Sequence, residues 1–460
     1  MDGQKNTTGE WKSQLIRGET RRQAIRELEK HPEAELAEIL QSIDIELLVD
    51  VLPLFSAEKQ GLVFAAFDMT NRLHLFRRVS KKWFASLFEQ MPSDSRADIF
   101  QHFSTQERVN LLPYLSKSTR EDVLRLSTYP HDTAGGIMST NFAIIKEKQT
   151  CEQAIQEIRK EVPREKMLYH LYVVDEDMHL IGYMSLKDLV IAEPNELVTA
   201  IMQTEFATAS LDEDRESVAK KIEKYDTIAL PVVNENNQLM GIVHHDDAIE
   251  VIRAEQTEDM EKFMGIIPGD EVLNYNQTTV LGHFRKRVIW LAILTVVGFV
   301  SGMIIQRYED ALSALMILAL YIPMIADTGG NSGSQAATVV IRAMALGQVN
   351  INNWMAILFK EMRISALLAA VLALIAFFLI LILSWESDTT LNHSLGFIAF
   401  GISAALAFQI ITSTIIGAGL PLLVNRFGGD PAVAASPAIT TIVDISGLLI
   451  YFGVATLLFF

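Results

Sequence analysis

The chain has 460 residues, of which 39 are Lys or Arg, 56 are Asp or Glu, and one is a cysteine, Cys151. A single cysteine excludes a disulfide framework and a cysteine-rich zinc or iron–sulfur site. A net charge of −17 argues against nonspecific nucleic-acid binding, which needs basic side chains to contact phosphates. The charge is unevenly divided: residues 284–460 hold 8 basic and 8 acidic residues, so residues 1–283 account for the whole net charge.

Residues 1–130 show helical hydrophobic spacing without strand-like runs, as in Leu36, Ile39, Leu40 and Ile43. Hydrophobic residues followed by proline separate the short helical segments. These pairs are Leu52-Pro53, Met91-Pro92 and Leu112-Pro113. The pattern predicts short helices that stack into an acidic superhelix.

Residues 131–253 contain an internal repeat with an offset of 59 residues. The segment from His170 to Gly182 matches the segment from Ala229 to Gly241. Each unit (131–198 and 199–253) predicts a helix, a strand, a tight turn, a strand and a helix, and we assign the closing glycine to hairpin chemistry. The repeat resembles a tandem pair of CBS domains, which often bind adenine nucleotides. The resemblance implies a nucleotide site at Lys187 and Asp188, with ATP as a possible modulator.

Residues 284–460 contain five long stretches that are almost free of charge. About 20 apolar residues span a bilayer as a helix, so we predict a transmembrane domain of five helices. The stretches are 288–306, 311–341, 364–385, 389–425 and 431–460. With the N-terminal region in the cytoplasm, seven basic residues flank the inner ends and only Arg307 flanks the outer ends. This predicts a multi-pass protein of the plasma (inner) membrane with its C-terminus outside.

One carboxylate, Asp444, lies near the middle of the last stretch. Burying it at the bilayer centre costs at least about 2.5–3.5 kcal/mol, so we expect it to face a bundle interior or a water-filled path. A structural or proton-relay role is the alternative. Pro431, Pro437 and Gly447 are expected to loosen this helix and free backbone carbonyls.

The second stretch carries the run from Thr328 to Gln335, which is rich in small residues. We predict that it breaks the helix, so that the carbonyls of Gly329, Gly330 and Asn331 contact a hydrated cation. The alternative is close helix packing through small residues, which suits Gly333.

The chemistry of the acids favours a hard cation. Asp444 and Asp430 offer oxygen ligands, and the spans hold no thiolate, which disfavours a soft metal. Mg²⁺ keeps several waters and needs few carboxylates. A homodimer that places two copies of Asp444 on its axis would suit hydrated Mg²⁺, although Mn²⁺, Co²⁺ and Ca²⁺ remain open.

The segment after the repeat, residues 254–283, begins as an acidic connecting helix. Further acids stand in the second repeat and in the helical module. These acids either form a solvated acidic face, or they form clusters that oppose one another and come together only when divalent cations bind between them.

The order of these modules resembles the MgtE family of magnesium channels and transporters. The resemblance rests on Thr328-Gly-Gly-Asn-Ser-Gly-Ser-Gln335, Asp430-Pro-Ala-Val-Ala-Ala-Ser-Pro437, Asp444, Ala134-Gly-Gly-Ile-Met138, Tyr172-Val-Val-Asp175 and Ala254-Glu-Gln-Thr-Glu-Asp259. It implies a homodimeric Mg²⁺ channel in the membrane, with pore residues Asp444, Asp430, Gly329, Gly330, Asn331 and Thr440. It also implies gating by cytosolic Mg²⁺ at Asp50, Asp94, Asp98, Asp214, Glu216, Asp226, Asp247, Glu250, Glu255, Glu258 and Asp259.

The chain departs from the family pattern at several positions. Asp327 precedes the Thr-Gly-Gly-Asn motif, and Thr440 replaces a common alanine. Glu250 replaces an expected aspartate. His170 and Lys187 stand where tyrosine and arginine are usual.

Three other interpretations remain. An intramembrane aspartyl protease could pair Asp327 with Asp444, but the Gly-x-Gly-Asp signature of that class is absent. A sensor anchored by the membrane helices would not need Asp444. A proton-coupled cation carrier could use Asp444 as its proton site. We find no catalytic triad or P-loop and expect a protein that is not an enzyme.

Overall fold

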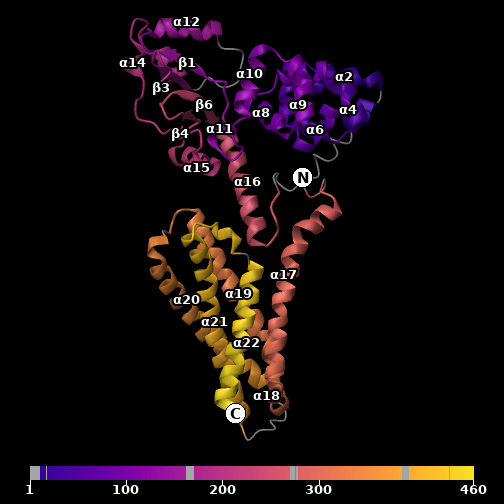
Figure 1. Ribbon diagram of the computed structural model, residues 1–460, viewed down its shortest axis with the longest axis vertical. Helices are drawn as coiled ribbons and strands as arrows, with labels where there is room; N and C mark the ends of the chain where they lie inside the picture. Colours follow the sequence, from indigo (N-terminus) through magenta and orange to yellow (C-terminus); the bar gives the residue numbers. More distant parts are fainter. Residues whose placement is uncertain are drawn as a thin grey trace. The chain divides into compact units, whose positions relative to one another are not determined.

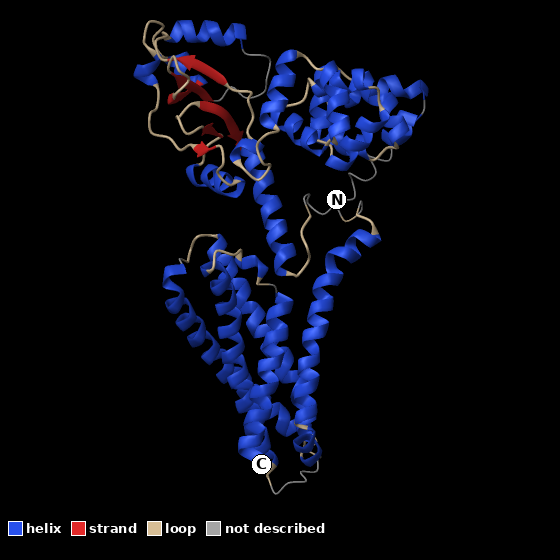
Figure 2. Ribbon diagram, in the orientation of Figure 1, coloured by secondary structure: helices blue, strands red, loops and turns tan. Residues whose placement is uncertain are grey.

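The computed structural model describes residues 11–16, 18–161, 170–269, 275, 278–349, 351–385, 393–434 and 436–460. The acids Glu386 and Asp388, which stand between the third and fourth predicted stretches, lie outside these residues. The chain divides into two compact units, Met1–Arg253 and Ala254–Phe460. The first unit combines short helices with strands, whereas every regular element described in the second is helical (Figures 1 and 2).

The first unit begins with the predicted stack of short helices. They are α2 (Gly18–Leu28), α3 (Glu33–Gln41), α4 (Ile45–Val51), η1 (Leu52–Leu54), α5 (Ala57–Ala65), α6 (Met69–Arg78), α7 (Lys81–Phe88), α8 (Ser93–His102), α9 (Thr105–Leu111), η2 (Leu112–Tyr114) and α10 (Lys117–Leu126). Pro53 and Pro113 lie in the first turn of the 3-10 helices, where a missing N–H costs nothing. Phenylalanine rings fill the core, and Phe76 stacks on Phe103 with centroids 4.0 Å apart.

The repeat forms two three-stranded sheets of identical topology. Their elements are α11 (Ala134–Ile137), β1 (Ala143–Lys146), α12 (Cys151–Glu161), β2 (His170–Val174), β3 (Leu180–Ser185), α13 (Leu186–Ile191), α14 (Val198–Ile201), β4 (Ala209–Ser210), α15 (Arg215–Tyr225), β5 (Ala229–Val233) and β6 (Leu239–His244). In each sheet a parallel pair is followed by an antiparallel pair. The register shifts after Val173 in one sheet and after Val232 in the other, which is the 59-residue offset of the repeat.

Each repeat unit also pairs with the other one. Ser139, which precedes β1, bridges to Ile242 in β6, and Gln203 bridges to Tyr183 in β3. The pairing of the two repeat units is therefore reciprocal. Each repeat unit contributes a segment to the edge of the other's sheet, and neither sheet is complete without it.

The predicted hairpins are present, and the repeat glycines, Gly182 and Gly241, lie in the strands that follow their turns. Met178 and Asn237 take the positive φ angles of the turns, 68° and 59°. Gly241 lies within β6, where a Cβ would be 2.6 Å from the sulfur of Met138, and Gly182 meets Met202 in the same way. The glycines thus admit the methionine of the opposite repeat unit.

The second unit is a helical bundle joined to the first through α16 (His245–Phe263). Its further elements are α17 (Val280–Arg307), α18 (Glu309–Ala314), α19 (Ile317–Ala345), η3 (Ile351–Asn353), α20 (Trp354–Leu383), α21 (Leu395–Arg426), η4 (Pro431–Val433) and α22 (Ser436–Phe459). Four of the described helices, α17, α20, α21 and α22, are long and apolar enough to cross a membrane. Helix α19 is long but richer in polar residues, so the count of five spans stays a prediction.

The predicted break in the second stretch is not present, and the fifth stretch is one helix from Ser436 onward, after the separate 3-10 helix η4. Helix α19 continues through Pro323 and the glycine run, and α22 continues past Gly447. A glycine inside a helix costs only about 1 kcal/mol, and packing repays that cost here. A Cβ at Gly417 of α21 would lie 2.0 Å from the carbonyl oxygen of Gly333, so the two backbones touch.

We predict that Gly241→Ala destabilises the protein by about 1–3 kcal/mol, because the added methyl overpacks the contact with Met138. The measurement is thermal unfolding of the full chain in detergent. The double variant Gly241→Ala with Met138→Ala serves as the control and should recover part of the loss. Equal stability of Gly241→Ala and the wild type would contradict this account of the repeat.

Candidate functional site

Helix α19 presents a polar face. Asp327, Asn331, Gln335 and Thr338 follow one another at intervals of four, four and three residues, and all four are exposed in the single chain. This spacing places them on one side of the helix. A helix at membrane depth can carry such a face only against water or against another protein surface.

Helix α22 presents Asp444. Its side chain is partly exposed and makes no hydrogen bond or ion pair with any residue that the structure describes. One turn earlier, Thr440 donates to the carbonyl of Ser436, 3.0 Å away, and Ser436 donates to Ser334 of α19 at 3.0 Å. Hydroxyl groups therefore link α19 and α22 on the side of α22 that leads to Asp444.

The predicted glycine ligands lie in packed positions. A Cβ at Gly330 would be 2.9 Å from the methyl group of Thr440, and one at Gly329 would be 2.4 Å from the amide of Gln409. This supports the alternative of close packing through small residues. Of the three residues in this motif, Asn331 is the exposed one. A contact between a cation and these carbonyls remains a prediction.

Sequence reasoning missed Gln409 in α21. It is fully buried, and its amide nitrogen donates to the carbonyl oxygen of Val443, 2.9 Å away. The available signal was an amide within a long apolar stretch.

The predicted pore-mouth acid, Asp430, is paired with a lysine. Lys262 at the end of α16 lies 2.8 Å from Asp430 and 2.7 Å from Glu258. Burial alone would lower the pKa of Lys262, but its hydrogen bonds with these two carboxylates outweigh burial and raise it. The next residue, Phe263, packs against a cluster that includes Val443. The end of α16 is thus fixed within the second unit by one ionic and one apolar contact.

In the first unit the structure brings together some of the predicted sensing acids. Asp94 of α8 lies close to Asp247 and Glu250 of α16. Burial, and then the charge of Asp94, raise the pKa of Asp247 to about 8. Burial also raises the pKa of Asp94 and that of Glu250. At Glu250 the charge of Arg72 partly offsets this rise. Each of these carboxyl groups therefore makes ionisation of its neighbours less favourable, and Arg72 compensates only part of this effect.

Other predicted sensing acids have local partners. Asp98 pairs with Arg72 at 3.4 Å, and Glu216 pairs with Lys220 at 2.7 Å. Asp214 caps α15 and Asp226 ends it in a left-handed conformation. Asp50 is exposed on α4, and Glu255 and Asp259 are partly buried on α16.

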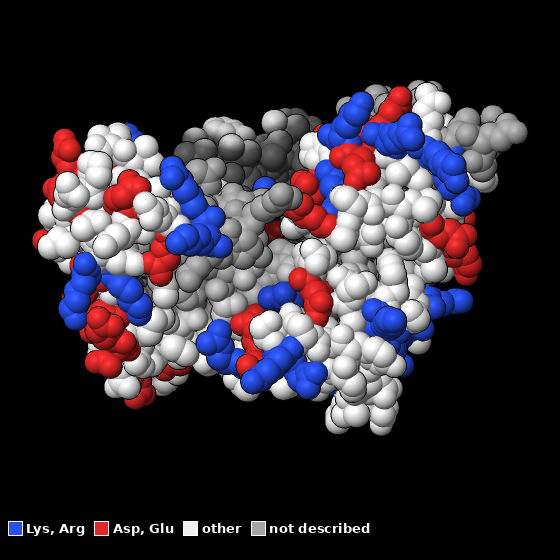
Figure 3. Space-filling view, turned by 90° about the horizontal axis from the view of Figure 1, so that it is seen from above, with Lys and Arg blue, Asp and Glu red and all other residues white. Residues whose placement is uncertain are grey.

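The predicted sensing acids do not form a complete metal site. Among the residues that the structure describes, no three His, Cys, Asp or Glu side chains are arranged to hold a metal ion. On the face shown in Figure 3, acidic and basic side chains are interspersed. The unit's excess negative charge is therefore not concentrated in one patch on that face.

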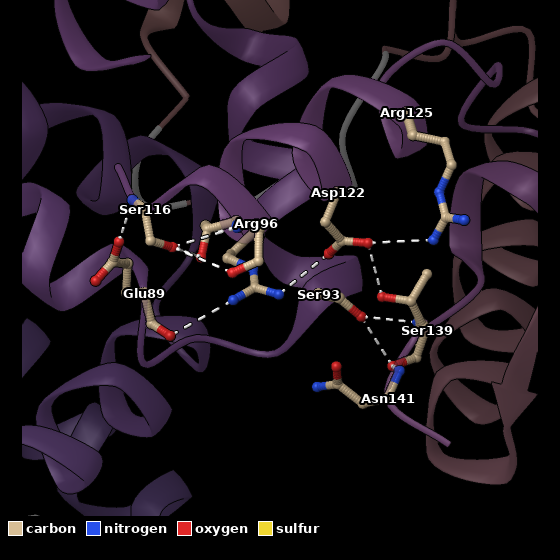
Figure 4. Close-up of polar contacts among 11 residues, drawn as sticks. Glu89, Ser93, Arg96, Ser116, Asp122, Arg125, Ser139 and Asn141 are labelled. Atoms are coloured by element: carbon tan, nitrogen blue, oxygen red, sulfur yellow. Dashed lines mark hydrogen bonds and ion pairs between the residues drawn. The ribbon is translucent and has the colours of Figure 1, made fainter. Parts of the chain in front are cut away.

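A polar junction fixes α8, and with it Asp94, to the repeat (Figure 4). The buried hydroxyl groups of Ser93 and Ser139 are 3.0 Å apart. Asp122 of α10 accepts hydrogen bonds from Thr140 at 2.9 Å and from Arg96 at 3.2 Å. These contacts fix α8 and α10 against the segment that precedes β1.

A cavity of about 170 Å³ lies between the two repeat units. Its lining residues are His170, Tyr172, Tyr183, Glu205, Phe206, Ala207, Tyr225, Thr227, Ala229, Leu230 and Pro231. The hydroxyl of Tyr172 is buried there and has no hydrogen-bond partner in the described part of the chain. The predicted nucleotide residues Lys187 and Asp188 are not part of this lining, and Asp188 instead accepts a hydrogen bond from Ser185 at 2.6 Å.

Comparison with known families matches all three modules. Residues 322–454 match the divalent cation transporter family MgtE, residues 21–132 match the MgtE intracellular N domain, and residues 134–195 and 198–254 match CBS domains. A crystal structure of the cytosolic domain of the Mg²⁺ channel MgtE in complex with ATP is 30% identical, with a TM-score of 0.48, over 50% of this chain and 94% of that one.

Two relatives match most of the chain. The magnesium transporter MgtE of Thermus thermophilus is 36% identical over 79% of each chain. The magnesium transporter MgtE of Bacillus subtilis is 32% identical over 92% of this chain and 89% of its own. The chain therefore belongs to the MgtE family of magnesium transporters.

Proposed function

We propose that this protein is a Mg²⁺-selective channel of the plasma membrane, with its N-terminus in the cytoplasm and its C-terminus outside. The observation that carries the proposal is Asp444, a carboxylate on a long apolar helix that has no polar partner among the described residues. A charge in this position is retained when it faces a water-filled path. Magnesium suits the path because it binds through few carboxylates and keeps most of its waters.

The polar face of α19 supports a homodimer. Asp327, Asn331 and Gln335 are exposed in the single chain, and lipid is an unsuitable neighbour for them. A second copy would cover this face and place two copies of Asp444 along a shared path. The apolar side chains of α17, such as Phe299, which is 72% exposed, suit lipid or the partner chain.

We propose that the acids of the first unit sense cytosolic Mg²⁺. Asp94, Asp247 and Glu250 are close together and partly desolvated, so ionising all three at once is unfavourable in the closed arrangement. A divalent cation would remove the repulsion and stabilise that arrangement. The remaining predicted sensing acids would complete ligand sets only with a partner chain or after a rearrangement.

Helix α16 connects the sensor with the pore in this proposal. It carries Asp247 at its start and Lys262 near its end. The ion pair of Lys262 with Asp430 would hold the helix end in the closed state. Loss of cytosolic Mg²⁺ would release the sensor acids and weaken this hold.

A second proposed role is binding of a nucleotide such as ATP in the cavity between the repeat units. Aromatic side chains suit an adenine ring, and the free hydroxyl of Tyr172 suits one of its nitrogens. The cavity is smaller than the roughly 300–1,000 Å³ of typical ligand pockets. It therefore suits the base better than the phosphates.

We predict that Tyr225→Ala weakens ATP binding by about tenfold, because base stacking on an aromatic ring contributes about 1–3 kcal/mol. Tyr225 is 55% exposed, so its removal should leave the core intact. The measurement is isothermal titration of the full chain with ATP. Tyr114→Ala, an equally exposed tyrosine of the helical module, is the control. Equal affinity for ATP in the wild type and Tyr225→Ala would place any nucleotide elsewhere.

We predict that Asp444→Asn lowers Mg²⁺ influx into proteoliposomes at least about tenfold, since losing roughly 1.4 kcal/mol of attraction lowers occupancy by that factor. Asp310→Asn, which removes a carboxylate from the short helix α18, should conduct normally. Normal influx through Asp444→Asn would remove this residue from the path. Influx that requires a pH gradient would identify a proton-coupled carrier instead.

We predict that Asp247 makes the protein less stable as the pH rises from about 4 to about 8. Its folded pKa of about 8 exceeds the unfolded value of about 3.9, so the unfolded state releases the proton first. The stabilisation is complete below the unfolded pKa and is lost as the pH rises through 8. Over this pH range the melting temperature of Asp247→Asn should fall by at least about 2 °C less than that of the wild type.

Magnesium and a matched variant test the cause of this pH dependence. Added Mg²⁺ should restore wild-type stability at pH 8 more than that of Asp247→Asn. Glu235→Gln, an exposed acid in a hairpin turn, should behave as the wild type. An unchanged pH dependence in Asp247→Asn would show that the acid cluster is not its source.

A further inference from the structure

The side chain of Gln409 lies where three helices of the second unit meet. Helix α21 contributes the side chain, which is fully buried. Helix α22 contributes the carbonyl oxygen of Val443, which accepts a hydrogen bond from the amide nitrogen at 2.9 Å. Helix α19 contributes Gly329, against which the amide packs. The residue after Val443 is Asp444.

Two glycines make room for this amide. A Cβ at Gly329 would lie 2.4 Å from the Nε2 atom of Gln409, and a Cβ at Gly447 would lie 2.6 Å from it. Both distances are shorter than side-chain atoms tolerate. Gly447 is also four residues after Val443, so it is the residue whose N–H bonds the same carbonyl within the helix. Its missing side chain leaves the carbonyl open to Gln409.

Packing alone does not explain a glutamine here. Its nitrogen must face the oxygen of Val443, and this fixes the orientation of the amide. The Oε1 atom is then buried with no partner among the residues that the structure describes. An unpaired buried acceptor costs free energy, whereas methionine would fill a similar volume without that cost.

We propose that Gln409 is a positioning residue of the cation path, which holds the backbone at Val443 and thereby sets the place of Asp444 relative to α19. The inference rests on the proposed function, in which the cation passes Asp444. Gln409 contacts backbone on α22 and a backbone glycine on α19, so it fixes the distance between the two helices rather than one rotamer. That distance determines how well the path suits a hydrated Mg²⁺ compared with Ca²⁺, which takes more ligands at longer distances.

The test measures influx of Mg²⁺ and of Ca²⁺ into proteoliposomes that contain the full chain. Gln409→Met keeps the volume of the side chain and removes the hydrogen bond. We expect the ratio of Mg²⁺ influx to Ca²⁺ influx to fall about tenfold, with assembly retained. Ser446→Ala is the matched control, because Ser446 donates to the same carbonyl from within α22 at 2.9 Å without joining two helices. It should keep the wild-type ratio.

The glycine gives an independent variant. Gly447→Ala should displace the amide and lower the ratio as Gln409→Met does. In the double variant Gly447→Ala with Gln409→Ala, the clash is gone, so assembly should recover while the ratio stays low. Recovery of the wild-type ratio in the double variant would show that Gln409 only fills space and would overturn the inference.

The outcomes separate this inference from the proposed function. Wild-type Mg²⁺ influx with an unchanged ratio in Gln409→Met would overturn the positioning role alone. A wild type that carries no Mg²⁺ would overturn the proposed function and the positioning role together. A lowered ratio in both Gln409→Met and Gly447→Ala, with Ser446→Ala normal, is the result that supports the inference.

Discussion

The arrangement of the second unit depends on one constraint: a carboxylate on a long apolar helix must have a polar environment. Asp444 has no partner within the described chain, so the environment must come from water or from another subunit. The polar face and Ser334 belong to the neighbouring helix α19, and Ser436, which bonds to Ser334, lies on the helix of Asp444 itself. Apolar residues occupy the outer surfaces, as on α17. The position of Asp444 thus accounts for where the other polar groups of the bundle lie.

The sequence alone predicted those features that depend on local pattern. Hydrophobic spacing and charge distribution are properties of neighbouring residues, and they identified the helical stack, the repeat and the apolar helices. The repeat was confirmed down to the register shift at Val173 and Val232. The breaks predicted at Gly329 and Gly447 were wrong, because a glycine's effect on a helix depends on what packs against it. Here the packing partner is Gln409 of another helix.

The same distinction applies to the acids. A count of carboxylates could not separate Asp98, which Arg72 neutralises, from Asp94 and Asp247, which lie close together. Both situations arise from residues distant in sequence. The pairing of Lys262 with Asp430 spans 168 residues and has no sequence signal, since each residue alone resembles an ordinary surface charge. Candidate ligands can be proposed from residue type, but their free or paired state follows only from the fold.

The lysine at the end of α16 has a consequence for Asp430. A metal ion leaves its ligands when its concentration falls, but an ammonium group carried on the chain stays at a high effective concentration that the cell does not alter. Asp430 therefore has a counter-charge whose presence does not depend on the concentration of any free cation. Under the proposed function, the contact at the end of α16 is a fixed part of the closed form, and the adjustable part falls to Asp94 and Asp247.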